Sequence, residues 1–249
     1  MYIGLSSALV FSSITVASDD KGDECYKHFS DGDYSSARQQ CQELAELGDA
    51  KAAFLLANIY YQGLETSQDD QRGLFWDQIA AEKGHPESAY RLGLAYQLGQ
   101  GVGQNNNKAR SWYQQAALAQ HPKAQNLLGN MFETGAAGEK SHSRAYQWYM
   151  RAAQQGLADT QLKVGSMLLN GRGVEANRAS AQHWIRKAAT AGNSNAQVAL
   201  GVLLTGTDSA ESLSWYERSA EQGNGVALQN LSLVYYVGQG VEADHARGV

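Results

Sequence analysis

The sequence is poor in the residues that break helices and in clusters of positive charge. Only 2 of its 249 residues are proline, which favours helices because proline interrupts them. Charged residues make up 18% of the chain, the formal net charge is -5, and no run of basic residues stands out. We therefore expect no nucleic-acid partner, because phosphate backbones are bound by clustered Lys and Arg.

Long apolar runs are absent beyond the first residues. Residues 1–18 carry no charged side chain and end in small residues before Asp19. This pattern predicts a signal peptide at 1–18, cleaved near Ala17 or Ser18, and a periplasmic or secreted protein. The alternative is an uncleaved membrane anchor, but the apolar run is shorter than the ~20 residues that a span needs. We expect no integral membrane span.

Cysteine is nearly absent, since Cys25 and Cys41 are the 2 cysteines of the chain. An even pair this close together in an exported protein is a candidate disulfide, which would staple an N-terminal partial repeat or cap at 19–48. Two buried free thiols are the alternative. A metal site is a poorer one, because no His lies at ligand spacing beside the pair.

What the sequence does contain is a repeat. Asn107–Ala117, Ser143–Ala153 and Ala179–Ala189 are similar segments spaced by 36 residues. The tryptophans lie in one column of that repeat, at positions 76, 112, 148, 184 and, after a shorter interval, 215. A fixed period of this length predicts an α-solenoid, in which each unit buries its apolar face against its neighbours. Full repeats are predicted at 49–84, 85–120, 121–156, 157–192 and 193–223, with a partial repeat at 224–249.

Each repeat is predicted to hold two helices. The second helix starts at a column of strong N-cap residues, which are Asp33, Asp69, Asn105, Ser141, Asn177, Asp208 and Asp244. The first helix carries a small column at Ala57, Gly93, Gly129, Gly165, Gly201 and Ser232, which indicates close approach of a neighbouring helix. We expect the Trp column to be buried, so that Trp148→Ala costs roughly 3–5 kcal/mol.

The combined pattern, Ala-x-x-x-Leu-Gly-x-x-Tyr-x-x-Gly-x-Gly-Val followed by Ala-x-x-Trp-Tyr-x-x-Ala-Ala-x-x-Gly, resembles the Sel-one-like repeat family, relatives of the tetratricopeptide repeats. The resemblance covers about residues 49–249. It implies an all-α, right-handed superhelix of antiparallel helix pairs that binds other proteins on its concave side. It also implies export and a role at the bacterial cell envelope.

A cysteine-rich branch of the family is linked to penicillin binding. This chain lacks the cysteines of that branch outside Cys25 and Cys41, and it has no Ser-x-x-Lys motif. The activity of that branch is therefore not expected here.

The concave side is expected to be lined by first-helix positions that the packing columns leave unused. These candidate partner-binding residues are Phe54, Asn58, Tyr61, Tyr90, Leu94, Gln97, Asn126, Asn130, Glu133, Leu162 and Ser166. Mixed aromatic and amide side chains suit a peptide or loop ligand. The alternative is that Phe54, Tyr90 and Leu162 are inter-repeat core. On the first interpretation, replacing Tyr90 and Asn130 together leaves stability nearly untouched.

The sequence thus predicts a monomeric, non-enzymatic scaffold with a protein partner. The repeated Asp, His and Ser residues all have a structural role; His85 and His121, for example, are equivalent loop positions. We expect no catalytic residue, no metal and no cofactor. The alternatives are an inhibitor of a sensor protein and a cell-wall or glycan-processing enzyme or its regulator. The enzyme would need clustered carboxylates, whereas Glu24, Glu43, Glu46 and Glu65 are expected to be scattered on the surface.

Overall fold

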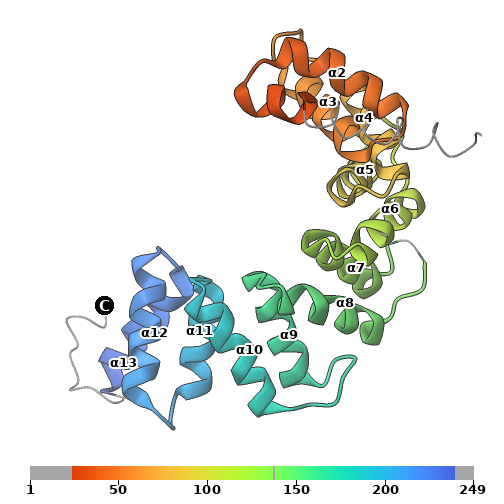
Figure 1. Cartoon of the computed structure of the whole chain (residues 1–249). Coiled ribbons are helices and arrows are strands. Elements are labelled where there is room, and N and C mark those ends of the chain that lie inside the picture. Colours follow the sequence, from red (N-terminus) through yellow and green to blue (C-terminus); the bar gives the residue numbers. More distant parts are fainter. Residues whose placement is uncertain (1–23, 137, 239–249) are drawn as a thin grey trace, which may run out of the picture. The chain divides into compact units, whose positions relative to one another are not determined.

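The structure is a computed structural model that describes residues 24–136 and 138–238 (Figure 1). These residues form helices and connecting turns, without a strand among them. Residues 24–31 are helical and precede the labelled helices. The labelled helices are α2 (Tyr34–Glu46), α3 (Ala50–Gln62), α4 (Asp70–Glu82), α5 (Pro86–Leu98), α6 (Asn106–Leu118), α7 (Pro122–Thr134), α8 (His142–Gln154), α9 (Ala158–Asn170), α10 (Arg178–Thr190), α11 (Ser194–Leu204), α12 (Ser209–Glu221) and α13 (Gly225–Val237).

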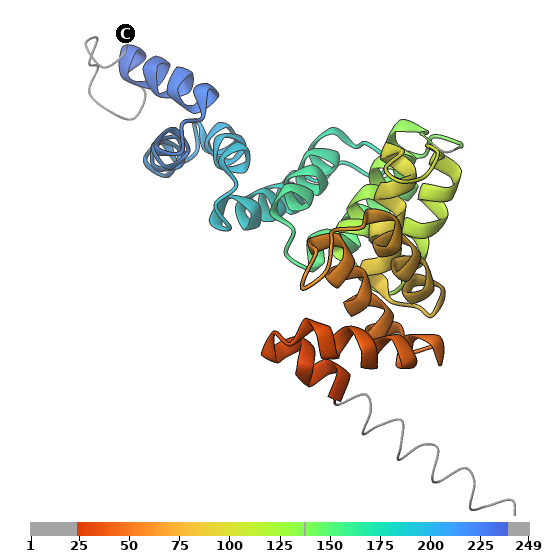
Figure 2. The same ribbon diagram turned by 90° about the horizontal axis from the view of Figure 1, so that it is seen from above.

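The chain forms two compact units that divide between His121 and Pro122, called unit 1 and unit 2 below. Within each unit, helices that follow one another in sequence pack side by side, as α3 and α4 do in unit 1 and α11 and α12 in unit 2 (Figures 1 and 2). The first helices of the repeats are α3, α5, α7, α9, α11 and α13. The second helices are α4, α6, α8, α10 and α12, together with α2 of the leading partial repeat. The predicted all-α solenoid of paired helices is confirmed.

The predicted start of the second helices is confirmed at each described position. A side-chain oxygen of the N-cap residue accepts a hydrogen bond from the backbone N–H three residues later, which satisfies a donor that the helix itself leaves unpaired. This holds for Asp33, Asp69, Asn105, Ser141, Asn177 and Asp208. Asp244 lies outside the described residues.

The second helices end on a residue in the left-handed region. Gly48, Gly84, Gly156, Gly192 and Gly223 have φ between 79° and 98° there. In the repeat that contains α6, the position is Gln120, with φ of 64°. A residue with a Cβ is strained in this conformation, so Gln120 in place of the glycine of the other repeats lowers the stability of the fold.

The tryptophan column is buried as predicted at Trp76 and Trp215, which are 7% and 6% exposed, and is less buried than predicted at the three positions between them. Trp112, Trp148 and Trp184 are half-buried, and the guanidinium of Arg151 lies 4.5 Å from the centre of the Trp148 ring. The core position is one residue later, where the side chains of Tyr113, Tyr149 and Ile185 are 0–1% exposed. The prediction for Trp148 was therefore wrong, since its ring lies at the surface under a cation while its neighbour points inward.

The glycine column of the first helices is explained by that inward-pointing neighbour. A Cβ added at Gly129 in α7 would lie 2.6 Å from the Tyr149 ring, which comes from α8 of the same repeat. Gly201 stands in the same relation to Tyr216, also at 2.6 Å. The expected close approach is confirmed, and the approaching group is a tyrosine ring at Gly93, Gly129 and Gly201 and the Ile185 side chain at Gly165.

A disulfide joins Cys25 to Cys41 and so links the segment 24–31 to α2. Both cysteines are fully buried. The candidate disulfide is confirmed, and the described residues contain no group of three or more His, Cys, Asp and Glu side chains that could hold a metal ion.

The predicted signal peptide at 1–18 lies outside the described residues. In the described part of the chain, every helix is too short or too polar to cross a membrane.

Candidate functional site

The predicted partner-binding residues all lie on first helices and none of them is fully buried. Those in unit 1 are Phe54, Asn58 and Tyr61 on α3 and Tyr90, Leu94 and Gln97 on α5. Those in unit 2 are Asn126, Asn130 and Glu133 on α7 and Leu162 and Ser166 on α9. They form two separate stripes, which we call the unit 1 stripe and the unit 2 stripe.

Two aromatic residues of the unit 1 stripe pack against the turn that leads into the next repeat. The Phe54 ring stacks on His85 with 4.2 Å between ring centroids, and the Tyr90 ring stacks on His121 at 4.6 Å. His85 also caps α5, since its Nδ1 accepts a hydrogen bond from the backbone N–H of Ser88 at 3.3 Å. Burial lowers the pKa of His85, and the charge of Arg91 lowers it further. The two histidines therefore have the structural role that was predicted.

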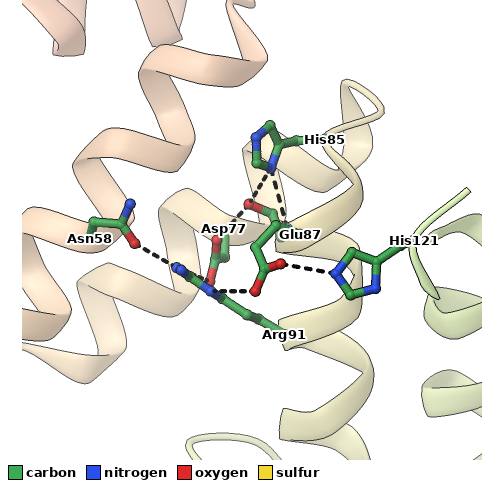
Figure 3. Close-up of polar contacts among 7 residues, drawn as sticks. Asn58, Asp77, His85, Glu87, Arg91 and His121 are labelled. Carbon is green, nitrogen blue, oxygen red and sulfur yellow. Dashed lines mark hydrogen bonds and ion pairs between the residues drawn. The ribbon is translucent and has the colours of Figure 1, made fainter. Parts of the chain in front are cut away.

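Beneath the unit 1 stripe lies a buried polar cluster that the sequence analysis missed (Figure 3). Asp77, on α4, is fully buried, and its Oδ1 accepts a hydrogen bond of 2.6 Å from the Ser88 hydroxyl. Its Oδ2 is buried without a hydrogen-bond partner among the described residues and lies 3.7 Å from Nη1 of Arg91. Burial raises the pKa of Asp77 to about 6, although the bond from Ser88 and the charge of Arg91 oppose the shift.

Arg91 connects this cluster to the rest of unit 1. Its Nη1 donates to Oδ1 of Asn58 at 2.7 Å, and its Nε lies 3.6 Å from Oε1 of Glu87. The other oxygen of Glu87 lies 2.9 Å from Nε2 of His121 (Figure 3). Side chains from α3, α4, α5 and the turn at His121 are thus joined in one polar network.

The signal for Asp77 is in the sequence, because the residue stands in the column that Tyr113, Tyr149 and Tyr216 occupy in other repeats. There, the tyrosine of the second helix donates to an acceptor on the first helix, as Tyr149 does to Glu133 at 2.7 Å and Tyr113 to Gln97 at 2.6 Å.

In the repeat of α3 and α4 the two roles are exchanged. Tyr61 of α3 stands in the column of Gln97 and Glu133, and Asp77 of α4 stands in the tyrosine column. Burial, and next the charge of Asp77, raise the pKa of the Tyr61 phenol. The glycine that makes room for the tyrosine ring is also on the other helix in this repeat. A Cβ at Gly73 would lie 2.6 Å from the Tyr61 ring, whereas the usual glycine column of α3 holds Ala57.

The unit 1 stripe borders a hollow of about 580 Å³, which we call the unit 1 hollow. Its lining includes Tyr61, Asp70, Leu74, Arg91, Leu94 and Gln100. Most of these residues have equivalents 72 positions later in a smaller hollow of about 100 Å³, the unit 2 hollow, whose lining includes Glu133, Lys163, Ser166 and Arg172.

An ion pair accounts for the smaller size of the unit 2 hollow. Nη1 of Arg172 lies 3.3 Å from Oε1 of Glu133, and both residues line the hollow. In unit 1 the corresponding residues are Gln100 and Tyr61, which cannot form an ion pair. The unit 1 hollow therefore remains open.

Polar contacts between repeats occupy much of the unit 2 stripe. Nζ of Lys163 donates to Asn130 at 2.8 Å and to Asn126 at 3.2 Å, and the Tyr149 hydroxyl, whose hydrogen Asn130 and Glu133 share as acceptors, lies 2.5 Å from Oδ1 of Asn130. Asn130 therefore connects two repeats, and the expectation that replacing it leaves stability untouched does not fit these contacts. Leu162 packs against the core of the next helices, while Ser166 is exposed.

The carboxylates that the enzyme alternative would need are exposed, as expected, but two of them are not scattered. Glu24 and Glu43 line one hollow of about 280 Å³ near α2. Glu65 instead accepts a hydrogen bond of 2.7 Å from the backbone N–H of Ser35.

Comparison with known proteins identifies the repeat. The family model of the Sel1 repeat matches residues 50–85, 86–121, 122–157, 158–193, 194–224 and 225–249, one residue later than the predicted boundaries. A search of curated proteins finds no match.

Two solved structures are similar over most of this chain. One is c5321, described as a protective antigen present in uropathogenic Escherichia coli strains and displaying an SLR fold. It is 34% identical with a TM-score of 0.75, over 85% of this chain and 46% of the antigen. The chain therefore spans about half the length of that protein. The other is a Sel1 repeat protein from Oxalobacter formigenes, which is 27% identical with a TM-score of 0.79, over 90% of this chain and 94% of that protein.

Proposed function

We propose that the chain, which belongs to the Sel1 repeat family, is a scaffold of the bacterial cell envelope that binds a protein partner through its first helices. The observation that carries the proposal is the unit 1 hollow. It is open, it lies beside the predicted stripe, and it combines apolar, aromatic and charged side chains. Such a combination fits an inserted segment of another protein, in which apolar contacts give affinity and a few polar groups give specificity.

The proposed location outside the cytoplasm rests on the disulfide. Cys25 and Cys41 are joined and buried, and stable structural disulfides are characteristic of oxidising compartments. Thiol labelling of the protein after acid quenching and denaturation of the cells tests this directly, because denaturation exposes both buried cysteines. Labelling only after reduction supports export, and labelling of free thiols without reduction contradicts it.

Site-specific photo-crosslinking in cells tests the binding face. A photoreactive residue at Gln100, which is exposed beside the unit 1 hollow, or at Ser166, which is exposed beside the unit 2 hollow, is expected to capture the partner. Gln114, exposed on second helix α6, is the matched control and is expected to capture little.

Capture of the same protein with equal yield at all three positions would contradict a binding face on the first helices. Replacing Leu94 by Glu places a charge in the apolar part of the unit 1 hollow and is expected to abolish capture at Gln100.

The enzyme alternative would have to start from the hollow shared by Glu24 and Glu43. A glycosidase needs one carboxylic acid that stays protonated near neutral pH, which burial normally provides. Both of these side chains are exposed. The carboxylate of Asp77 is buried in the repeat interior, where it is hydrogen-bonded to Ser88. These observations favour the scaffold.

A further inference from the structure

Arg91 is the cationic side chain that lines the unit 1 hollow, and its charge is only loosely paired. The side chain is 28% exposed. Its one hydrogen bond within normal distance goes to the neutral Asn58, whereas Glu87 and Asp77 lie 3.6 and 3.7 Å away. Nη2 makes no hydrogen bond to any residue that the structure describes. Arg91 therefore retains donors for an acceptor that enters the hollow.

Unit 2 shows which group fills the equivalent space. Lys163 occupies the column of Arg91, and the nearby charge of Glu133 favours its protonated form, although burial lowers its pKa overall. Glu133 also pairs with Arg172 across the unit 2 hollow. Unit 2 thus supplies its own carboxylate to the cations of its hollow. Unit 1 has Tyr61 at that position, so its cation lacks the corresponding anion.

The negative charge of the buried Asp77 carboxylate partly neutralises the positive charge of Arg91. The groups that face Asp77 are Tyr61 on α3, Ser88, Glu87 and Arg91 on α5, and His85 at the start of α5; Asp70 lies earlier on α4 itself. Only Arg91 among them is a permanent cation. Oδ2 of Asp77 is buried without a hydrogen bond of normal geometry among the described residues, and the nearby Tyr61 phenol compensates its negative charge only in part, so a proton is a natural occupant of that oxygen. Once Asp77 is protonated, it no longer neutralises the positive charge of Arg91.

Building on the proposed function, we propose that the unit 1 hollow binds a carboxylate of the partner on Arg91 and that protonation of Asp77 strengthens this binding. The partner's carboxylate takes the place that Glu133 has in unit 2. Apolar side chains next to it contact Leu74 and Leu94. The exposed carboxylate of Asp70 at the same hollow opposes binding of an anion. Because protonation removes the charge of Asp77, the site selects acidic segments most strongly under mildly acidic conditions.

The test is an NMR titration of the full chain with the acidic peptide acetyl-LELE-amide and its neutral counterpart acetyl-LQLQ-amide. We expect the acidic peptide to shift the Nε–Hε signal of Arg91 and to bind about tenfold more tightly at pH 5 than at pH 7. The peptide carboxylates are largely ionised at both pH values, so their own titration does not cause the difference. The neutral peptide is expected to bind weakly and without pH dependence.

Four variants separate the effect of Asp77 protonation from the binding site itself. Asp77→Asn is expected to bind the acidic peptide at pH 7 as tightly as the unchanged protein does at pH 5. Asp70→Asn is expected to strengthen binding equally at both pH values. Arg91→Gln is expected to remove binding, while Lys163→Gln, its equivalent in unit 2, leaves binding unchanged.

Equal binding of the two peptides, or no shift of the Arg91 signal by the acidic one, would overturn the carboxylate site. An unchanged pH dependence in Asp77→Asn would overturn the switch, and this result does not depend on whether Arg91→Gln folds. If either occurs while the photo-crosslinker at Gln100 still captures a protein, the scaffold proposal stands and this inference fails.

Discussion

The buried carboxyl of Asp77 predicts an unusual pH dependence of stability in unit 1. Its pKa in the folded protein is about 6, raised from a model-compound value of 3.8, so the folded state binds a proton more tightly than the unfolded chain. The stability that protonated Asp77 contributes is therefore fully present below about pH 4. It is lost as the pH rises to about 6, and it stays lost above that.

The magnitude follows from the shift of about two pKa units. At about 1.4 kcal/mol per unit, unit 1 is about 3 kcal/mol less stable at pH 7 than it would be with Asp77 protonated. Asp77→Asn keeps an acceptor for the Ser88 hydroxyl and removes the buried charge. We expect this variant to exceed the unchanged protein in stability by about 2–3 kcal/mol at pH 7 and to equal it near pH 4.

Hydrogen exchange of the α4 and α5 amides measures this locally, with the α10 and α11 amides of unit 2 as an internal reference. His85 acts with the opposite sign, because its lowered pKa contributes stability that is present above its ordinary value of 6.5 and is lost as the pH falls through the lowered pKa. The comparison of Asp77→Asn with the unchanged protein at each pH removes that contribution. A difference between them that is the same at pH 4.5 and pH 7 would refute the reasoning.

Four further predictions concern stability, each measured by urea unfolding. Tyr149→Ala is expected to cost about 3–5 kcal/mol, because it empties a fully buried site and removes the bonds to Asn130 and Glu133, whereas Trp148→Ala costs less than half as much. Gly129→Ala is expected to cost about 1–3 kcal/mol by overpacking against the Tyr149 ring, and a smaller residue at 149 should relieve the loss. Gln120→Gly is expected to gain up to about 1 kcal/mol by releasing a left-handed residue. Reduction of the Cys25–Cys41 disulfide is expected to cost about 3 kcal/mol, and an unchanged midpoint would contradict a stabilising role.

The repeat period and the capping residues made most of the fold predictable. Asp69 and Asn105 mark helix starts by a local interaction, in which the side chain accepts a hydrogen bond from the backbone N–H three residues later. Such signals need no knowledge of the neighbouring helix. Which of two adjacent aromatic residues points inward does need that knowledge. Trp148 and Tyr149 differ by about 100° around α8, and only the helix packed against them decides which ring is buried.

The repeat columns were enough to place the candidate residues on the first helices, whereas their contacts were not predictable. In the structure many of these side chains also connect repeats. Asn58 bonds to Arg91, and Phe54 stacks on His85. Asp77 was not singled out from the sequence, because each column was compared separately. The reason for an acidic residue at position 77 becomes clear only when this column is compared with the column of Tyr61, because the tyrosine and its acceptor have exchanged helices.

That pairing connects the packing of unit 1 with its proposed function. A tyrosine and an acceptor face each other in each repeat that has a tyrosine here, and exchanging their helices keeps the contact while moving the glycine from position 57 to position 73. The exchange has two further consequences. It removes from the hollow the carboxylate that Glu133 supplies in unit 2, and it buries the Asp77 carboxylate next to Arg91. The same pair of substitutions thus leaves the hollow open and brings a titratable group to its cation, which is why we place the binding site in unit 1.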